Sequence, residues 1–155
     1  MSATRIVRRW WILPLVYLVH LLDERIFGDG TAAWATTYGG VDFTNEAWLA
    51  VNVASFALLF GAAFATDRRR FPEWVFATLA VHLLLHAFVH VGGTLARPVP
   101  FPGVLTSVVL LLPVSLVLLR RAARSLPRAR FALGCGVGIL TMQPIYDFLL
   151  RLLLD

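Results

Sequence analysis

The segment WVFATLAVHLLLHAFVHVGGTL, residues 74–95, contains no charged residue and is long enough to cross a membrane as an α-helix. It carries three histidines at a strict spacing of four, His82, His86 and His90. Residues four apart lie on one face of a helix, so the three imidazoles form a stripe along this segment. Because ionisable side chains are costly inside hydrocarbon, such a stripe indicates a functional site within a membrane protein.

The whole 155-residue chain shares this apolar character. Hydrophobic residues make up 59% of it and charged residues 15%, whereas soluble domains carry about 25% charged residues. Four more apolar segments have a length near that of a membrane span, namely residues 10–27, 47–66, 104–119 and 131–154. Since lipid leaves no partner for an unpaired backbone group, these segments are expected to be helices. The sequence thus predicts one all-α membrane domain over residues 1–155, with five transmembrane helices.

The basic residues predict how this bundle sits in the membrane. All 14 are arginines, and most of them lie in clusters before the first segment and in alternate loops. Cytoplasmic loops carry an excess of basic residues, so five spans with a cytoplasmic N-terminus and an external C-terminus fit this pattern. The arginines do not form the continuous basic face that a nucleic-acid partner requires. We expect the first segment to be retained as a span, because no small-residue cleavage site follows it.

A second ionisable cluster, His20-Leu-Leu-Asp23-Glu24, lies in the first segment. Counted at about 1.5 Å per residue, it falls at the same depth as the histidine stripe, in the middle-to-outer half of the bilayer. Asn52 in the second segment and Asp147 in the fifth reach this depth as well. Gln143 and Tyr146 near Asp147 are expected to be structural.

These residue types predict a metal centre between the helices. Imidazoles and carboxylates suit Zn, Fe or Mn, and helical bundles present them to metals at a spacing of four. The predicted ligands are His20, Asp23, Glu24, His82, His86 and His90. Asp23, Glu24 and His90 are candidate catalytic groups, while Asn52 and Asp147 either orient an imidazole or join two helices. The alternative is that all these groups only hydrogen-bond across the bundle and hold it together.

Two further features bear on the architecture. Residues 28–44 form the longest connection, which is either a lid over the outer mouth of the bundle or a plain surface loop. Gly134-x-x-x-Gly138 matches a motif that lets helices approach closely, and we interpret it as structural.

At His20-Leu-Leu-Asp23-Glu24 the chain resembles the HXXEE family of small bacterial membrane proteins. The resemblance extends to Asn52, the histidine stripe and Pro102-Gly103-x-x-Thr106, over roughly residues 13–119. One departure is Asp23, which stands where the family motif has Glu and is one methylene shorter. The resemblance implies a protein of the bacterial cytoplasmic membrane and a single site built from these positions. It implies no particular reaction.

Taken together, the sequence predicts a membrane metalloenzyme that acts on a lipid or another hydrophobic small molecule. The reaction is either oxidative at a di-iron centre or hydrolytic at zinc, with manganese as a further candidate metal. One alternative is a metal-free isomerase or cyclase that uses Asp23 or Glu24 as a general acid. Others are a proton or metal-ion transporter, and a subunit that packs against another copy of the chain or a partner membrane protein.

Overall fold

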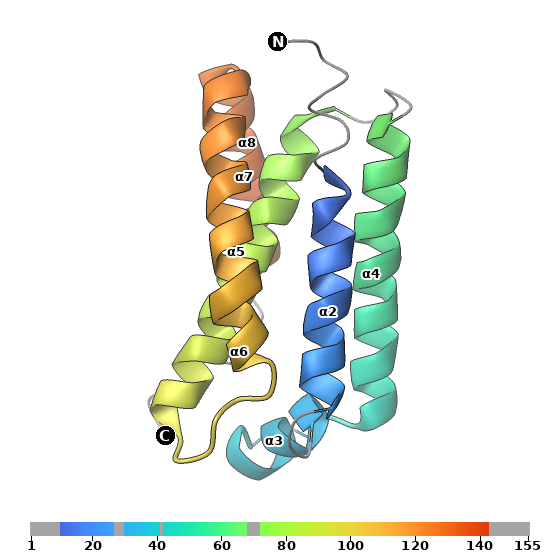
Figure 1. The fold of residues 1–155 in the computed structure, drawn as a ribbon, viewed down its shortest axis with the longest axis vertical. Helices are drawn as coiled ribbons and strands as arrows, with labels where there is room; N and C mark the ends of the chain where they lie inside the picture. The colour runs from blue at the N-terminus through green and yellow to red at the C-terminus, as the bar shows by residue number, and fades with distance from the viewer. Residues whose placement is uncertain (1–9, 27–29, 41, 68–71, 143–155) are drawn as a thin grey trace.

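The computed structural model describes residues 10–26, 30–40, 42–67 and 72–142, and every regular element in these ranges is helical (Figure 1). The predicted all-α class is therefore confirmed. The elements are α2 (Ile12–Ile26), α3 (Gly30–Tyr38), α4 (Asn45–Asp67), α5 (Trp74–Ala96), α6 (Val104–Thr106), the π-helical turn η1 (Ser107–Leu111), α7 (Leu112–Ser125) and α8 (Arg128–Thr141).

Among the described residues, three helices are long and apolar enough to cross a membrane. They cover Asn45–Ala65, Trp74–Ala96 and the continuous helix Val104–Ser125 formed by α6, η1 and α7. The prediction of five spans is therefore wrong for this part of the chain. Helix α2 has 15 residues, which rise about 22 Å and fall short of a hydrocarbon core of about 30 Å. Helix α8 is described for 14 residues, and the rest of the predicted segment 131–154 lies outside the described residues.

The helix that begins at Val104 continues six residues past its predicted end at residue 119. The prediction followed hydropathy, but a helix backbone needs no apolar side chains, and Arg120, Arg121 and Arg124 are good helix formers. This helix also contains Pro113, which has no backbone N–H to donate to the preceding turn. The wider π turn directly before it, η1, accommodates that missing hydrogen bond.

The helices pack in two groups (Figure 1). Helix α2 lies beside α4, and α5 packs against α7 and α8. Helix α6 and η1 contact both α2 and α5 and so connect the groups. The shared core contains Trp10 stacked on Phe76 at 4.0 Å between ring centroids, with Leu13 and Leu111 almost fully buried. Burial of such large side chains stabilises the folded chain by about 1.5–3 kcal/mol each.

The predicted close contact at the glycine motif is confirmed. A Cβ atom on Gly134 would lie 2.5 Å from the Trp74 carbonyl oxygen, and one on Gly138 would lie 2.9 Å from that of Thr78. The Thr78 hydroxyl donates to the Gly134 carbonyl at 2.9 Å. Only glycine lets α8 approach α5 this closely.

Residues 30–38 form helix α3 where the sequence predicts a loop. Helix α3 lies across the end of the bundle where α2 ends and α4 begins (Figure 1). Buried Trp34 explains the helix, because its ring packs against Phe101 at 4.2 Å and its Nε1–H donates to the Val99 carbonyl at 3.2 Å. Tertiary contacts thus override a sequence rich in glycine and threonine.

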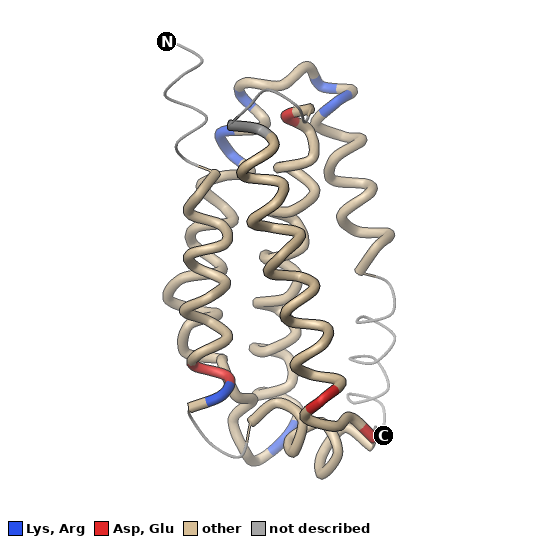
Figure 2. The backbone as a smooth tube through the Cα atoms, turned by 90° about the vertical axis from the view of Figure 1, so that its right-hand side faces the viewer, with Lys and Arg blue, Asp and Glu red and all other residues tan. Residues whose placement is uncertain are grey.

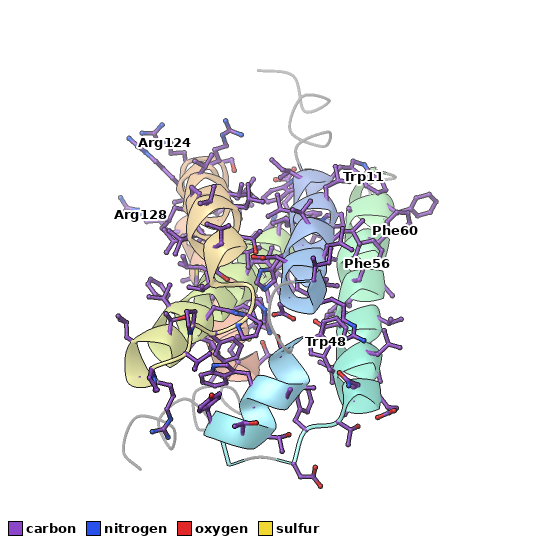
Figure 3. All side chains as sticks on the ribbon, turned by 60° about the horizontal axis from the view of Figure 1, so that its bottom comes forward. Trp11, Trp48, Phe56, Phe60, Arg124 and Arg128 are labelled. Carbon is purple, nitrogen blue, oxygen red and sulfur yellow. The ribbon has the colours of Figure 1, made fainter. Side chains whose placement is uncertain are left out.

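Charged residues mark the ends of the bundle. Figure 2 shows basic residues gathered where α7 joins α8, and in Figure 3 Arg124 and Arg128 extend outward there. Trp48 lies toward the opposite end of the bundle, on the part of α4 next to α3 (Figure 3). The orientation of the termini across a membrane stays a prediction.

Candidate metal centre

Four side chains from two helices bring their donor atoms together near the α3 end of the bundle. His20 and Glu24 come from α2, and His86 and His90 come from α5. Their donor atoms all lie within 4.8 Å of one another, and we call this set the four-donor cluster. Within each helix the two donors are one turn apart, so both point toward the facing helix. His20, Glu24 and His90 are buried, whereas the side chain of His86 is 24% exposed.

Five of the six separations between the donor atoms are short, between 3.0 and 3.5 Å. His86 Nε2 lies 3.1 Å from His20 Nε2 and 3.2 Å from His90 Nε2. Glu24 Oε1 lies 3.1, 3.5 and 3.0 Å from the Nε2 atoms of His20, His86 and His90, respectively. In a tetrahedral zinc site with bonds of about 2.0–2.1 Å, neighbouring donors are about 3.3 Å apart. Five of the six separations thus match the size of such a site.

The far side of His90 fixes its tautomer. His90 Nδ1 lies 2.6 Å from the backbone carbonyl oxygen of Pro102, which can only accept a hydrogen bond. Nδ1 therefore carries a proton and donates it. In a neutral imidazole the other nitrogen, Nε2, then holds an unshared lone pair, and this lone pair faces the cluster.

His20 is fixed in the same way by a side-chain relay. The Thr106 hydroxyl and the Thr106 backbone N–H both donate to Asp23 Oδ2, at 2.6 and 3.0 Å. Because the hydroxyl proton is directed to Asp23, the Thr106 oxygen accepts from His20 Nδ1 at 2.8 Å. His20 Nε2 is thereby left with its lone pair toward the cluster. Such a carboxylate-based partner behind an imidazole is typical of metal-binding histidines.

Glu24 is held from its opposite side by α4. The Trp48 indole N–H donates to Glu24 Oε2 at 2.9 Å, which leaves Oε1 directed at the three imidazoles. Trp48 is held in turn, since Asn52 Nδ2 donates to the Trp48 carbonyl at 2.9 Å and Asn52 Oδ1 accepts from the Tyr17 hydroxyl at 2.6 Å. Three helices therefore determine the position of one carboxylate.

These hydrogen bonds create a shortage of protons at the centre. His20 Nε2 and His90 Nε2 are lone-pair acceptors, yet they lie 3.1 and 3.0 Å from a third acceptor, Glu24 Oε1, in a buried space. Acceptors facing one another repel unless a positive charge lies between them, and a buried unpaired carboxylate is costly. A cation bound among the four donors, or extra protons on the imidazoles, satisfies the arrangement. The spacing and the fixed tautomers both fit a metal cation.

Gly103 closes the cluster from the side of α6. A Cβ atom there would lie 2.7 Å from Glu24 Cγ and 2.8 Å from His20 Cε1. Its φ angle of 81° also belongs to the left-handed region that favours glycine. This residue lets the turn before α6 pass directly over the donors, which brings Pro102 and Thr106 to their partners.

A cavity of about 530 Å³ adjoins the cluster. Glu24, His86 and His90 form part of its wall, so the donors are approached from this side. Most of the remaining wall is apolar or aromatic and comes from α4 and α5, with smaller parts from α2, α3, Phe43, Phe101 and the end of α8. The volume falls in the range of about 300–1,000 Å³ that is usual for small-molecule sites.

The structure brings four of the six predicted metal ligands together, namely His20, Glu24, His86 and His90. Asp23 is not among the four donors because its carboxylate binds Thr106. His82 is one turn too far along α5 and instead lies at the cavity wall, with Nε2 3.5 Å from the Thr141 hydroxyl.

The two predicted orienting residues have different outcomes. Asn52 contacts Trp48 and Tyr17 rather than an imidazole, so it acts on the site only through Trp48. Asp147 lies outside the described residues, as do Gln143 and Tyr146.

Sequence reasoning missed Trp48, and it placed Pro102 and Thr106 at the site through the family resemblance without finding what they do there. Trp48 reads as an ordinary interfacial aromatic, and the Pro102 carbonyl carries no side-chain signal at all. Thr106 is visible as a polar residue at the start of a helix, but its link to both His20 and Asp23 depends on tertiary structure.

Comparison with known proteins agrees with this set of positions. Residues 11–118 match the model of a family described as a protein of unknown function with an HXXEE motif. The chain belongs to the HXXEE family. Its motif residues His20 and Glu24 are donors in the cluster, and Asp23, at the first acidic position of the motif, supports His20 through Thr106. No curated protein and no solved structure matches the chain.

Proposed function

We propose that this HXXEE protein is an integral membrane metalloenzyme that holds one zinc ion in the four-donor cluster and hydrolyses a hydrophobic substrate bound in the adjoining cavity. The observation that carries the proposal is the set of lone pairs on His20, His90 and Glu24, directed into one buried cluster in which five of the six donor separations are 3.0–3.5 Å. Three imidazoles and one carboxylate are a donor set that zinc accepts, and catalysis would require zinc to take a fifth ligand, the water or the substrate carbonyl oxygen, as zinc sites sometimes do.

Each residue has a defined part in this proposal. His20, His86, His90 and Glu24 would hold the ion, while Thr106 and the Pro102 carbonyl keep two imidazoles in the required tautomer. Zinc in such a site supplies Lewis acidity, which polarises a carbonyl group and makes water more acidic. The cavity borders Glu24, His86 and His90, so the substrate carbonyl approaches beside His86, the most exposed donor.

The overall reaction consumes one water molecule. The water oxygen bonds to the carbonyl carbon, the acyl C–O or C–N bond breaks, and the leaving group takes up a proton. The apolar cavity wall limits the access of bulk water, which strengthens electrostatic effects near the donors.

The geometry favours this proposal over a di-iron centre. Bundles that bind two metal ions supply about four carboxylates and two histidines. Within the described part of the chain, one group of metal-binding side chains is present, and it contains a single carboxylate. A metal-free acid mechanism is also less favoured, because Asp23 and Glu24 are each engaged by several hydrogen-bond partners.

The test is metal content together with hydrolysis. Protein purified in mild detergent is expected to contain one zinc per chain by elemental analysis, and His86→Ala is expected to lose it. His82→Ala, on the same face of α5 but outside the cluster, serves as the matched control and keeps the metal. A chelator should abolish cleavage of long-chain esters or amides, and added zinc should restore it. Equal metal content in both variants would refute the proposal.

A further inference from the structure

The cavity next to the cluster is elongated along two helices. Its α5 wall is the stripe Leu79, His82, Leu83, His86, Val89 and His90, and its α4 wall is the stripe Trp48, Val51, Asn52, Ser55, Leu58 and Leu59. Each stripe follows helical spacing over eleven residues, which corresponds to about 16 Å. The two stripes face each other across the cavity, so the space is a channel parallel to the helices.

The polarity of this channel changes along its length. Helices α4 and α5 run in opposite directions (Figure 1), so Trp48 and His90 lie at one end and Leu59 and Leu79 at the other. The first end contains Glu24 and the histidines of the cluster, and α3 contributes Thr31 and Ala35 there. The second end is mainly aliphatic, and its polar wall residues are His82 and Thr141, which face each other at 3.5 Å. A ligand that satisfies both ends has one polar group and a long apolar part.

The position of the channel further limits the classes of ligand that can reach it. Both helices that form its long walls are among the candidate membrane spans. Exposed side chains next to the α4 stripe are apolar as well, for example Leu49, Val53 and Phe60. A ligand that reaches this channel therefore comes from a surrounding hydrocarbon phase, where membrane lipids are the abundant amphiphiles.

We propose that the substrate is a lipid with an acyl chain, whose carbonyl lies beside the four-donor cluster and whose hydrocarbon chain extends between α4 and α5 toward Leu59 and Leu79. This assignment of the carbonyl rests on the proposed function, whereas the binding of the chain depends on the channel alone. A channel length of about 16 Å matches roughly a dozen methylene groups, because an extended residue spans about 3.3–3.6 Å over three backbone bonds and each methylene group adds one bond of similar advance.

The experiment uses a 16-carbon acyl methyl ester with a photoreactive diazirine near the end of its chain. Illumination of the full-length protein in lipid nanodiscs, followed by peptide mass spectrometry, is expected to label the aliphatic end of the channel, near Leu59, Leu79 and Leu83. Ser55→Phe and Leu79→Phe place a ring in the channel from opposite walls, and each should reduce this labelling at least fivefold. Val53→Phe, on an exposed part of α4, is the matched control and should label like the unmodified protein.

Metal content separates this inference from the proposed function. The Ser55→Phe and Leu79→Phe proteins should keep their zinc, which also shows that they are folded. His86→Ala should lose zinc but retain labelling of the channel. Labelling confined to outward-facing positions, or unchanged by both ring substitutions in folded protein, would overturn the acyl-chain assignment even if zinc is bound.

Discussion

Asp23 and Glu24 are neighbours in the chain, but their carboxylates serve different partners. Glu24 Oε1 faces three imidazoles at 3.0–3.5 Å, whereas Asp23 Oδ2 accepts two hydrogen bonds from Thr106. One acid is thus a donor of the cluster, and the other fixes the hydroxyl that orients His20. This division gives a physical reason for two consecutive acids three and four residues after a histidine.

The Asp23–Thr106 relay predicts a graded loss of metal affinity. Thr106→Val removes the hydroxyl that accepts from His20 and should weaken zinc binding about 10–100-fold, as is usual when the partner of a metal-bound imidazole is removed. Asp23→Asn should act in the same direction, because the amide no longer supplies a charge behind the hydroxyl. Competition with a chromogenic chelator measures both affinities.

The conservative variant tests whether the hydroxyl itself is responsible. Thr106→Ser retains the hydroxyl and should bind zinc nearly as well as the unmodified protein. If Thr106→Val binds equally well, the relay does not orient His20.

We predict that the cluster requires glycine at position 103 for two reasons: there is no room for a Cβ atom, and the φ angle is positive. Gly103→Ala would bring a methyl group within 2.7–2.8 Å of Glu24 and His20 and should abolish stoichiometric zinc binding. Gly40 also has a positive φ, but nothing lies within 4 Å of an added Cβ atom. Gly40→Ala therefore introduces backbone strain of about 1–2 kcal/mol without a steric clash. Zinc analysis of both variants separates the two effects, and equal loss in both would contradict this role of Gly103.

The α5–α8 contact predicts opposite effects for three glycines of one helix. Gly134→Ala and Gly138→Ala should each lower the free energy of unfolding by about 1–3 kcal/mol, because backbone or side-chain atoms of α5 lie within 3 Å of the added methyl. Gly136 has no such neighbour, so Gly136→Ala should be neutral or stabilise by up to about 1 kcal/mol. Thermal unfolding in detergent ranks the three variants, and a uniform effect would argue against close packing of α8 on α5.

The arrangement of the helices predicts which loops share a side of the membrane. Helix α3 and the α7–α8 connection lie at opposite ends of the bundle (Figure 1). With the arginine-rich end in the cytoplasm, reporters fused after residue 36 and after residue 124 should report the external and the cytoplasmic side, respectively. Both reporters on one side would contradict this topology.

Much of the site was predictable because helical spacing is local. His20 and Glu24 share one face of their helix, as do His86 and His90, because each pair is four residues apart. Counting residues along the two helices placed both pairs at the same depth, which predicted that they meet. The same reasoning extended the set of ligands to His82, which instead lies 3.5 Å from the Thr141 hydroxyl of α8. The number of donors at one point is a property of the packing.

The rest depended on contacts that the sequence does not encode locally. Trp34 is buried against Phe101, and this packing turns an expected loop into helix α3. Pro102 contributes a backbone carbonyl, which no residue type signals. The span count failed for a different reason, because apolar runs around α2 and α8 are longer than the helices described there.

The central claim is that three imidazoles and one carboxylate hold a single metal ion. X-ray absorption at the zinc edge, measured on protein carrying one zinc per chain, tests it most directly. We predict three imidazole nitrogens at about 2.0–2.1 Å together with oxygen, and no sulfur. A spectrum with fewer than three imidazoles, with sulfur, or with a second metal nearby would contradict the account.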